Sequence, residues 1–416
     1  LPQVEVASHT YTHPFDWSFF EAYSRADEEA KIASTTRPAI PFVERLRKGL
    51  IGLAGRSALT DQSNPYVAGS SDLPRTYLRH PFNLDKEVVD ALKVSEQLAP
   101  AGKKAKLYLW SGDTTPFEAA IAATRAAGVR NMNGGDSRLD KEYPSIFYVP
   151  PIARPAGKQR QIYAVNSNEN TYTNDWTGPF YGFFMLQNTL DNTEQPRRLK
   201  PFNLYYHMYS GEKAASLASI KHFLALARKS EVIPIDASDY AAIADDFFAA
   251  EIRQVDLFAW SITNRGALQT VRFDAADPIE IDMRRSRGVI GSNRKGDALY
   301  VTLDPVVERA VVALRARDLD TVRAAEPGEP AALVHARWRI YNRAEEGCGF
   351  RVAARGYGPG DMLWRVDPRR GYRIRAVAAG RVLNEEVRWS GPDGLLAFRL
   401  SAGNNEPVTV NIACHD

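Results

Sequence analysis

Two histidines four residues apart form the most chemically suggestive stretch of this sequence. His9 and His13 stand in SHTYTHP, after the alternating residues VEVAS. Two imidazoles and a carboxylate that face one point form a divalent-metal site with open positions for water and substrate. Zinc proteases use the same spacing, but on a helix with Glu after the first His. Here Thr10 follows His9, and Pro14 would disrupt a helix. We therefore predict that His9 ends a strand and His13 lies in the next turn. The alternative is a pair of loop histidines bonded to backbone.

Three other acid–base side chains follow segments that resemble strands. His207 ends FNLYYH, Asp113 follows KLYLW, and Asp136 follows VRNMN. Active sites of α/β barrels are built at the carboxyl ends of the strands. We therefore predict catalytic roles for all three, close to His9. For His207 the alternative is a structural role, and for each Asp it is the capping of a turn or helix.

Amide and aromatic side chains provide candidate sugar contacts. The segment 166–176, NSNENTYTNDW, is rich in both and lacks apolar periodicity. Planar hydrogen-bonding groups beside a ring suit sugar hydroxyls and acetamides, so Asn168 and Trp176 are predicted to bind substrate. Trp110, at the end of KLYLW, and Tyr206, next to His207, are included with them. An Asn-rich turn is the alternative for the segment.

The elements that would position these residues change character near residue 260. Before it, apolar strands alternate with helices, as in a parallel sheet or barrel. Residues 115–128 predict a helix with a Thr115–Glu118 capping box and a terminal Gly128. Further helices are expected at 19–33, 85–98, 210–229 and 239–249, a strand at 231–238, and an insertion loop at 55–74.

After residue 260 the segments alternate apolar and polar residues between turns. This pattern is typical of a β-sandwich or jelly roll. We therefore predict an α/β domain over residues 1–258 and an all-β domain over residues 259–416.

Composition limits the possible partners. The 416 residues carry a net charge of +3 with acids and bases interleaved, which argues against nucleic-acid binding. Apolar runs are too short for a membrane-spanning helix. Cys348 and Cys414 are either buried thiols or a disulfide, and a disulfide would require an oxidising compartment. The chain starts Leu-Pro-Gln, so we expect a piece of a longer protein.

Several of these stretches resemble one known family. SHTYTHP resembles the metal-binding His-x-x-x-His motif of the polysaccharide deacetylases, a family of carbohydrate esterases. LYYH before a helix resembles their last motif, whose histidine is the general acid. The resemblance runs from residue 4 to about residue 243 and is closest to the deacetylases that modify the Pel exopolysaccharide of biofilms. It is carried by SHTYTHPFDW, LYLWSGD, GVRNMNGGD, NENTYTN, GPFYGF and RRLKPFNLYYHMYSG.

The resemblance implies a fold, a reaction and a cellular location. The fold would be a (β/α) barrel-like domain that lacks its first strand or strands. The reaction would be metal-dependent N-deacetylation of a polysaccharide rich in N-acetylgalactosamine, with zinc or a similar ion held by His9 and His13. His207 would protonate the leaving amine. The protein would be periplasmic, with exopolysaccharide export proteins as further partners.

The sequence departs from the family pattern in two places. The family's aspartate motif precedes the histidines, but only eight residues precede His9. We expect that the chain begins after this motif and is inactive alone unless Asp113 or Asp136 supplies the carboxylate. In place of the family's Arg-x-Pro motif the chain has Trp110-Ser-Gly-Asp113.

Two other function classes remain open. A non-catalytic carbohydrate-binding or assembly module would bind sugar through tryptophans such as Trp338, Trp364 and Trp389. A metal-dependent glycosidase or esterase would show two carboxylates that flank one sugar bond.

Overall fold

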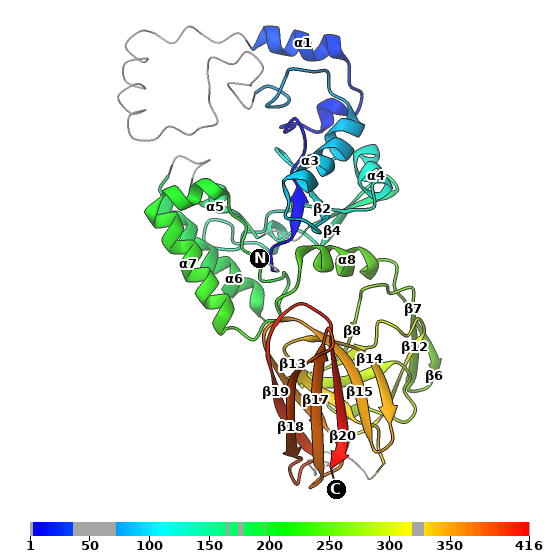
Figure 1. Ribbon diagram of the computed structural model, residues 1–416. Coiled ribbons are helices and arrows are strands. Elements are labelled where there is room, and N and C mark those ends of the chain that lie inside the picture. Colours follow the sequence, from blue (N-terminus) through cyan, green and yellow to red (C-terminus); the bar gives the residue numbers. More distant parts are fainter. Residues whose placement is uncertain are drawn as a thin grey trace. The chain divides into compact units, whose positions relative to one another are not determined.

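The computed structural model describes residues 3–35, 72–163, 166–173, 178–195, 197–317 and 328–415. The chain divides into an N-terminal unit, residues 5–228, and a C-terminal unit, residues 229–416 with residues 1–4 (Figure 1). The C-terminal unit thus includes a helix before its strands. The expected domain boundary after residue 258 stays a prediction. Most of the expected insertion loop, and Trp176, lie outside the described residues.

A parallel sheet in the order β1–β2–β3 organises the N-terminal unit. Its strands are β1 (Val6–Ser8), β2 (Ala105–Leu109) and β3 (Arg130–Met132). Beside it lies an antiparallel hairpin of β4 (Ala153–Ala156) and β5 (Gln159–Ile162). Tyr108, Trp110 and Trp17 form the centre of the core that fixes this sheet.

Helices complete the N-terminal unit. A π-helical turn, η2 (Lys86–Asp90), leads directly into α3 (Ala91–Leu98). The other α-helices are α1 (Arg25–Ser34), α4 (Glu118–Ala126), α5 (Glu169–Tyr172), α6 (Leu186–Glu194) and α7 (Ala214–Lys229). Short 3₁₀ turns are η1 (Ser18–Phe20), η3 (Ile146–Tyr148), η4 (Phe180–Met185) and η5 (Met208–Glu212).

The predicted capping box of α4 is wrong. The helix begins at Glu118, preceded by Phe117, rather than after Thr115. The Glu118 carboxylate accepts a hydrogen bond from the Lys158 backbone N–H at 2.9 Å instead. The predicted end of the helix is confirmed, because Gly128 follows it at φ 77°.

The predicted (β/α) barrel is also wrong. In the described part of the N-terminal unit the parallel sheet has three strands and does not close. Residues 202–207, expected to form a strand, have no regular secondary structure and belong to no ladder of the described residues. Side chains bond their backbone instead: Glu169 accepts from the His207 N–H at 2.6 Å, and Asn166 donates to the Asn203 carbonyl at 3.1 Å.

Residues 231–238 do not form the expected strand either. They lead into α8 (Ala237–Phe247) of the C-terminal unit. Pro234 has no N–H to donate to a ladder. The apolar residues of 202–207 and 231–238 alternate as they do in true strands, so this pattern alone did not distinguish the two segments from strands.

Three sheets form the rest of the described C-terminal unit, in the orders β6–β7–β12–β9, β19–β16–β13–β10–β11–β8 and β14–β15–β20–β17–β18. The four-stranded sheet and the first strands of the six-stranded sheet are β6 (Glu251–Asp256), β7 (Ala259–Thr263), β8 (Thr270–Phe273), β9 (Ile279–Ile281), β10 (Val289–Lys295), β11 (Ala298–Leu303) and β12 (Ala310–Ala316). The remaining strands are β13 (Ala332–Ala336), β14 (Arg339–Glu346), β15 (Gly349–Arg355), β16 (Tyr357–Arg365), β17 (Gly371–Ala378), β18 (Arg381–Trp389), β19 (Leu395–Asn404) and β20 (Val408–His415).

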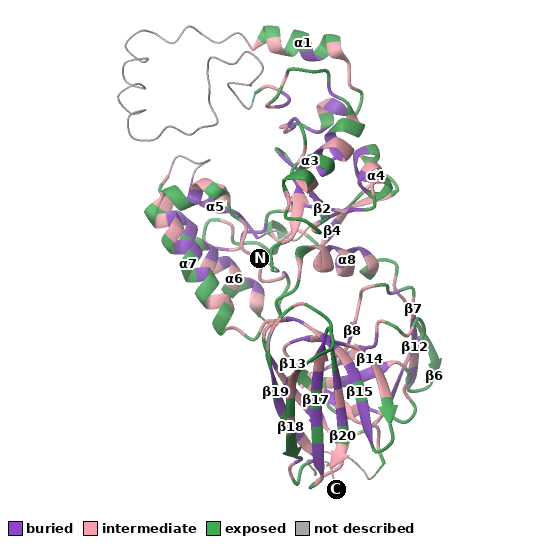
Figure 2. Cartoon of the chain, viewed as in Figure 1, coloured by how far each residue is buried: buried purple, intermediate pink, exposed green. Residues whose placement is uncertain are grey.

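Two cores hold these sheets together. One combines residues of the five- and six-stranded sheets and contains Trp338 and Trp364, and the other combines the six- and four-stranded sheets. Buried residues alternate with exposed ones along β17 and β20, as half-buried strands require (Figure 2). The predicted single sandwich or jelly roll is therefore corrected to three separate sheets.

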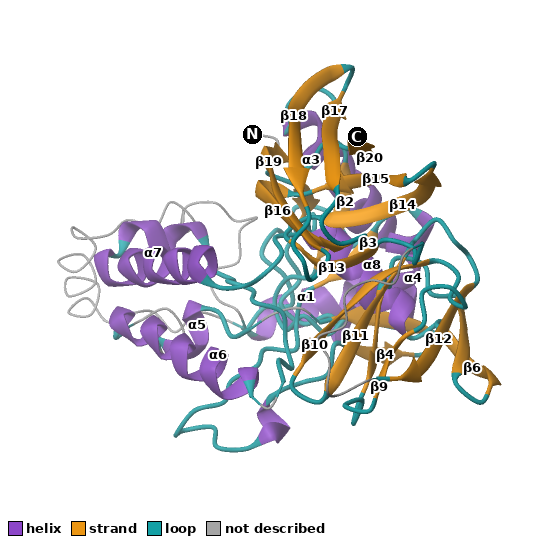
Figure 3. Ribbon diagram, turned by 90° about the horizontal axis from the view of Figure 1, so that it is seen from below, coloured by secondary structure: helices purple, strands orange, loops and turns teal. Residues whose placement is uncertain are grey.

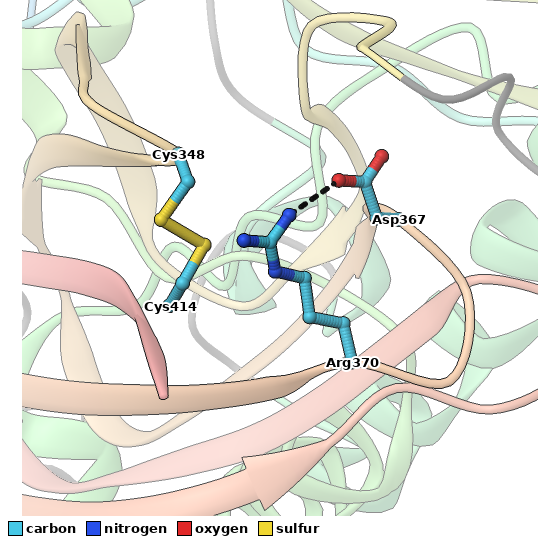
Figure 4. The surroundings of a disulfide bond; sticks show 4 residues. All are labelled: Cys348, Asp367, Arg370 and Cys414. Atoms are coloured by element: carbon cyan, nitrogen blue, oxygen red, sulfur yellow. Dashed lines mark hydrogen bonds and ion pairs between the residues drawn. A yellow bond between two sulfur atoms is a disulfide. The ribbon is translucent and has the colours of Figure 1, made fainter. Parts of the chain in front are cut away.

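A disulfide joins two of these strands. Cys348, in the turn between β14 and β15, is bonded to Cys414 near the end of β20, with Cα atoms 5.9 Å apart. Figure 4 shows the bond together with the neighbouring ion pair of Arg370 and Asp367, whose N–O distance is 3.1 Å. Among the described residues, no helix is long and apolar enough to cross a membrane.

Candidate metal and acid–base site

The two histidines of SHTYTHP lie together just beyond the first strand. β1 ends at Ser8, so His9 follows it directly, as predicted. The rings of His9 and His13 lie edge to face, with centroids 5.3 Å apart. His9 Nδ1 is 3.2 Å from the Leu109 carbonyl oxygen, which can only accept, so this nitrogen carries the proton. Nε2 of His9 is therefore the nitrogen available to a metal.

The surroundings keep both imidazoles neutral. Burial is the main cause that lowers the pKa of His9, to about 4, and nearby His13 and His207 lower it further. Burial and His207 also lower the pKa of His13. His9 still exposes part of its surface, so solvent can reach it. The direction of both shifts suits metal ligation, which requires unprotonated imidazole.

A buried carboxylate holds the chain between the two histidines. Oε1 of Glu87, on the π-helical turn η2, accepts from the backbone N–H groups of Tyr11 and Thr12, each at 2.7 Å. Oε2 accepts from the Thr12 hydroxyl at 2.8 Å. The bend itself places His13 at φ 55°, a left-handed conformation that non-glycine residues rarely adopt. Glu87 thus fixes a loop that would otherwise relax.

A second buried network supports the same loop from the other side. The Thr76 N–H donates to the His13 carbonyl at 3.1 Å, and the Thr76 hydroxyl is 3.3 Å from His13 Nδ1. Neighbouring Arg75 is fully buried and forms two hydrogen bonds to the Glu28 carboxylate, at 2.6 and 3.1 Å. Arg75 and Glu28 therefore anchor the segment that carries Thr76.

His207 is paired with a carboxylate that no sequence motif singles out. Glu169, at the start of α5, lies with Oε1 3.3 Å from His207 Nδ1 and also accepts from the Ser210 hydroxyl at 2.8 Å. Burial would raise the pKa of Glu169, but hydrogen bonds from His207 and Ser210 outweigh it, and the pKa is lowered. Glu169 is therefore ionised beside the His207 ring.

Asp136 belongs to the same electrostatic cluster. It follows β3 after Gly134 and Gly135, which adopt φ angles of 85° and 68°. Burial raises its pKa to about 6, although Lys200, a hydrogen bond with Thr171, and His207 oppose the shift. Lys200 is itself buried, which lowers its pKa to about 8. A carboxyl group that titrates near neutrality suits a general base.

His207 thus links the predicted residues. It influences the pKa of His9, of His13 and of Asp136. These four side chains come from β1 and its loop, from the end of β3, and from the segment before η5. The structure therefore brings together four residues that lie up to 198 positions apart.

Other predicted site residues have structural contacts. Asp113 accepts from the backbone N–H groups of Trp17, at 3.3 Å, and Thr115, at 3.2 Å, and so caps a turn. Trp110 is fully buried in the core, and its indole N–H donates to Asn131 at 3.0 Å. A sugar cannot reach it, so its predicted role in substrate binding is wrong.

The amide-rich segment is also mainly structural where it is described. The Asn168 side chain accepts from the Asn170 N–H at 3.0 Å and caps α5, as in the Asn-rich turn alternative. Tyr206 is 37% exposed and stands beside His207. Its predicted contact with substrate stays a prediction, as does that of Trp176, which lies outside the described residues.

The donor set fits part of a metal site. Two neutral imidazoles lie side by side, and the Nδ1 of His9 is held by a backbone carbonyl, the arrangement that orients metal-bound histidines. Within the described ranges, no group of three or more His, Cys, Asp or Glu side chains is placed to hold a metal ion. His9 and His13 could therefore supply two ligands.

Comparison of the sequence with models of protein families and with curated proteins finds no match.

Proposed function

We propose that the N-terminal unit catalyses metal-dependent removal of N-acetyl groups from an N-acetylhexosamine polysaccharide. The observation that carries the proposal is the ring contact of His9 and His13, with centroids 5.3 Å apart, together with the influence of His207 on the pKa of both histidines and of Asp136. Amide hydrolysis needs an activated water, charge stabilisation at the carbonyl and a proton for the departing amine, and these residue types match the three needs. The choice of N-acetylgalactosamine follows from the resemblance of the motifs.

Each residue of the site has a separate role in the proposed reaction. His9 and His13 would hold a divalent ion, zinc in the first instance, which when bound polarises the acetyl carbonyl and lowers the pKa of a bound water. Asp136 accepts the proton of the attacking water. His207, held by Glu169, donates a proton to the nitrogen as the C–N bond breaks. Acetate and a free amine are the products.

We also propose a periplasmic location, supported by the Cys348–Cys414 disulfide, because such bonds persist mainly in oxidising compartments. The proposal includes export proteins of the polysaccharide as partners.

The test measures acetate release from N-acetylgalactosamine oligomers and bound metal on the same sample. We expect wild-type chain to release acetate and the His9→Ala, His13→Ala double variant to lose both metal and activity. His222→Ala is the matched control, because His222 lies on α7 and bonds Gln187 at 3.1 Å. A version extended upstream is tested in parallel, since the resemblance places an aspartate motif there. If neither version releases acetate or binds metal, the enzyme proposal is wrong.

A separate pair of variants tests Asp136. Asp136→Asn should lower acetate release at least a hundredfold, because it removes the proton acceptor but keeps the shape. Asp113→Asn, in a turn, should change the rate less than threefold. Equal losses in both would remove Asp136 from the mechanism.

A further inference from the structure

One tryptophan of the C-terminal unit differs from those in its core. Trp338 and Trp364 are 1% and 0% exposed, whereas Trp389, at the end of β18, is 67% exposed. β18 is the edge strand of the five-stranded sheet and forms a hairpin with β17 (Figure 3). A large ring that is left in water at a strand end costs hydrophobic free energy, which suggests a surface that binds.

The strand register shows which side chains share the outer face with Trp389. Side chains directly opposite each other in antiparallel strands lie on one face. Trp389 pairs with Gly371 of β17, and Gly371 pairs with His415 of β20. Two residues along, Val387 pairs with Arg373. The inward-facing neighbours on β17, such as Tyr372, are buried in the core.

A further row of the same face is polar. Glu385 of β18 pairs with Arg375 of β17, Arg375 pairs with Asn411 of β20, and Asn411 pairs with Arg351 of β15. This row of planar hydrogen-bonding groups therefore crosses four strands. It lies beside the row that begins with Val387 and Arg373. Guanidinium, amide and carboxylate groups are those that can bond pairs of neighbouring sugar hydroxyls.

Small residues lie beside the ring. Gly371 has no side chain, and a Cβ there would come within 3.4 Å of the indole and 3.0 Å of the His415 carbonyl oxygen, so the indole lies against the backbone of Gly371. Ala413 lies opposite Arg373 in the adjacent row. Small residues therefore separate Trp389 from the arginines.

The charge of the face limits what it can bind. Three arginines, Arg351, Arg373 and Arg375, lie on this face with Glu385. Arg375 Nε is 3.7 Å from the Glu385 carboxylate, and Arg351 Nε is 2.8 Å from the Glu346 carboxylate. Two of the three positive charges are thus offset, and the single excess positive charge disfavours a polyamine relative to an uncharged strand.

We propose that this face, formed by Trp389, Arg373, Arg375, Asn411 and Arg351, binds a polysaccharide whose amino groups are acetylated. A sugar ring lies on the exposed indole, and the arginines and Asn411 bond hydroxyl and acetamide oxygens. The face prefers the acetylated strand to its deacetylated product. This binding needs no catalysis, and only the choice of N-acetylgalactosamine rests on the proposed function.

The experiment measures binding in the full chain with His9→Ala and His13→Ala, so that acetyl groups are not removed during the measurement. Calorimetry with N-acetylgalactosamine oligomers should show binding that Trp389→Ala weakens at least tenfold and that Trp389→Phe weakens less. Leu257→Ala, at an exposed position in the turn between β6 and β7 of another sheet, is the matched control and should bind like its parent. Thermal unfolding should be unchanged in all three, because the altered side chains are exposed.

A second binding measurement uses galactosamine oligomers. They should bind at least tenfold more weakly than acetylated oligomers at the same salt concentration. Equal binding by Trp389→Ala and its parent, or absence of binding by the parent, would overturn the proposal. Tighter binding of the galactosamine oligomers would overturn the charge argument and with it the stated preference. None of these outcomes depends on acetate release. The binding proposal and the catalytic proposal can therefore be overturned independently of each other.

Discussion

Glu169 holds the ring of His207 in place. Its ionised carboxylate is 3.3 Å from His207 Nδ1. Glu169→Gln keeps a hydrogen-bond acceptor but removes the charge. We expect about a tenfold loss of acetate release with bound metal unchanged, because the ring that donates the proton is held less firmly. Acetate release and metal content of the same sample check this, with Glu142→Gln as the exposed control. An unchanged rate would show that Glu169 only shapes the loop.

His9 makes stability depend on pH. In the unfolded chain a histidine takes up a proton near pH 6.5, whereas folded His9 resists protonation until about pH 4. The unfolded state therefore binds more protons between these values, and stability falls as the pH falls through this window. The urea midpoint of metal-free protein should drop more steeply between pH 6.5 and 4 in wild type than in His9→Gln. Parallel curves would contradict the assignment.

At the residue scale the sequence predicted the chemically unusual side chains but not their partners. His9, His13 and His207 stand out by rarity and by position after strand-like segments. Glu87 and Glu169 do not, because the loop amides that Glu87 binds are 75 and 76 positions away along the chain, and only folding makes them neighbours. Trp110 was misassigned because a sequence does not show which aromatic ring is buried.

The π-helical turn is the element that connects Glu87 to the histidine loop. Glu87→Ala would leave the Tyr11 and Thr12 amides without their acceptor in a largely buried loop. We expect a loss of about 3 kcal/mol in the free energy of unfolding, and metal affinity reduced at least tenfold. Glu87→Gln, which can still accept from the amides, should lose less of both. Urea denaturation and metal titration test this.

Glu96 supplies the control for that prediction. It lies on α3, directly after η2, and pairs with Lys104 on the surface at 3.0 Å. Glu96→Ala should change stability by less than about 0.5 kcal/mol and leave metal affinity unchanged. If both glutamates behaved alike, the loop would not depend on η2.

Elements with local signals were predictable, and those that depend on remote pairing were not. β2 and α7 were expected from apolar periodicity, and Gly128 from its role as a helix stop. Residues 202–207 and 231–238 have the composition of strands, but neither joins a ladder. Side chains bond the backbone of the first segment, and Pro234 lacks the N–H that a ladder needs in the second. A single strand pattern therefore cannot distinguish a barrel from a three-stranded sheet.

At the scale of the whole molecule, the disulfide belongs to the C-terminal unit alone. It closes a loop with a sequence separation of 66 residues. Cys348→Ser with Cys414→Ser should therefore destabilise the C-terminal unit by about 4 kcal/mol in the chain-entropy model. Metal affinity in the N-terminal unit should not change. Calorimetric unfolding with and without reductant, alongside metal titration, tests both expectations, and a coupled loss of metal would contradict the independence of the units.

The buried pair of Arg75 and Glu28 bears on how the chain tolerates change in length. Glu28 precedes residues 36–71 and Arg75 follows them, so their contact ties together the two ends of that stretch whatever its length. Insertion or deletion between these two anchors should therefore be accepted without moving Thr76 or His13. Evolution and protein engineering can use this position to add new segments to the molecule while the histidine loop keeps its shape.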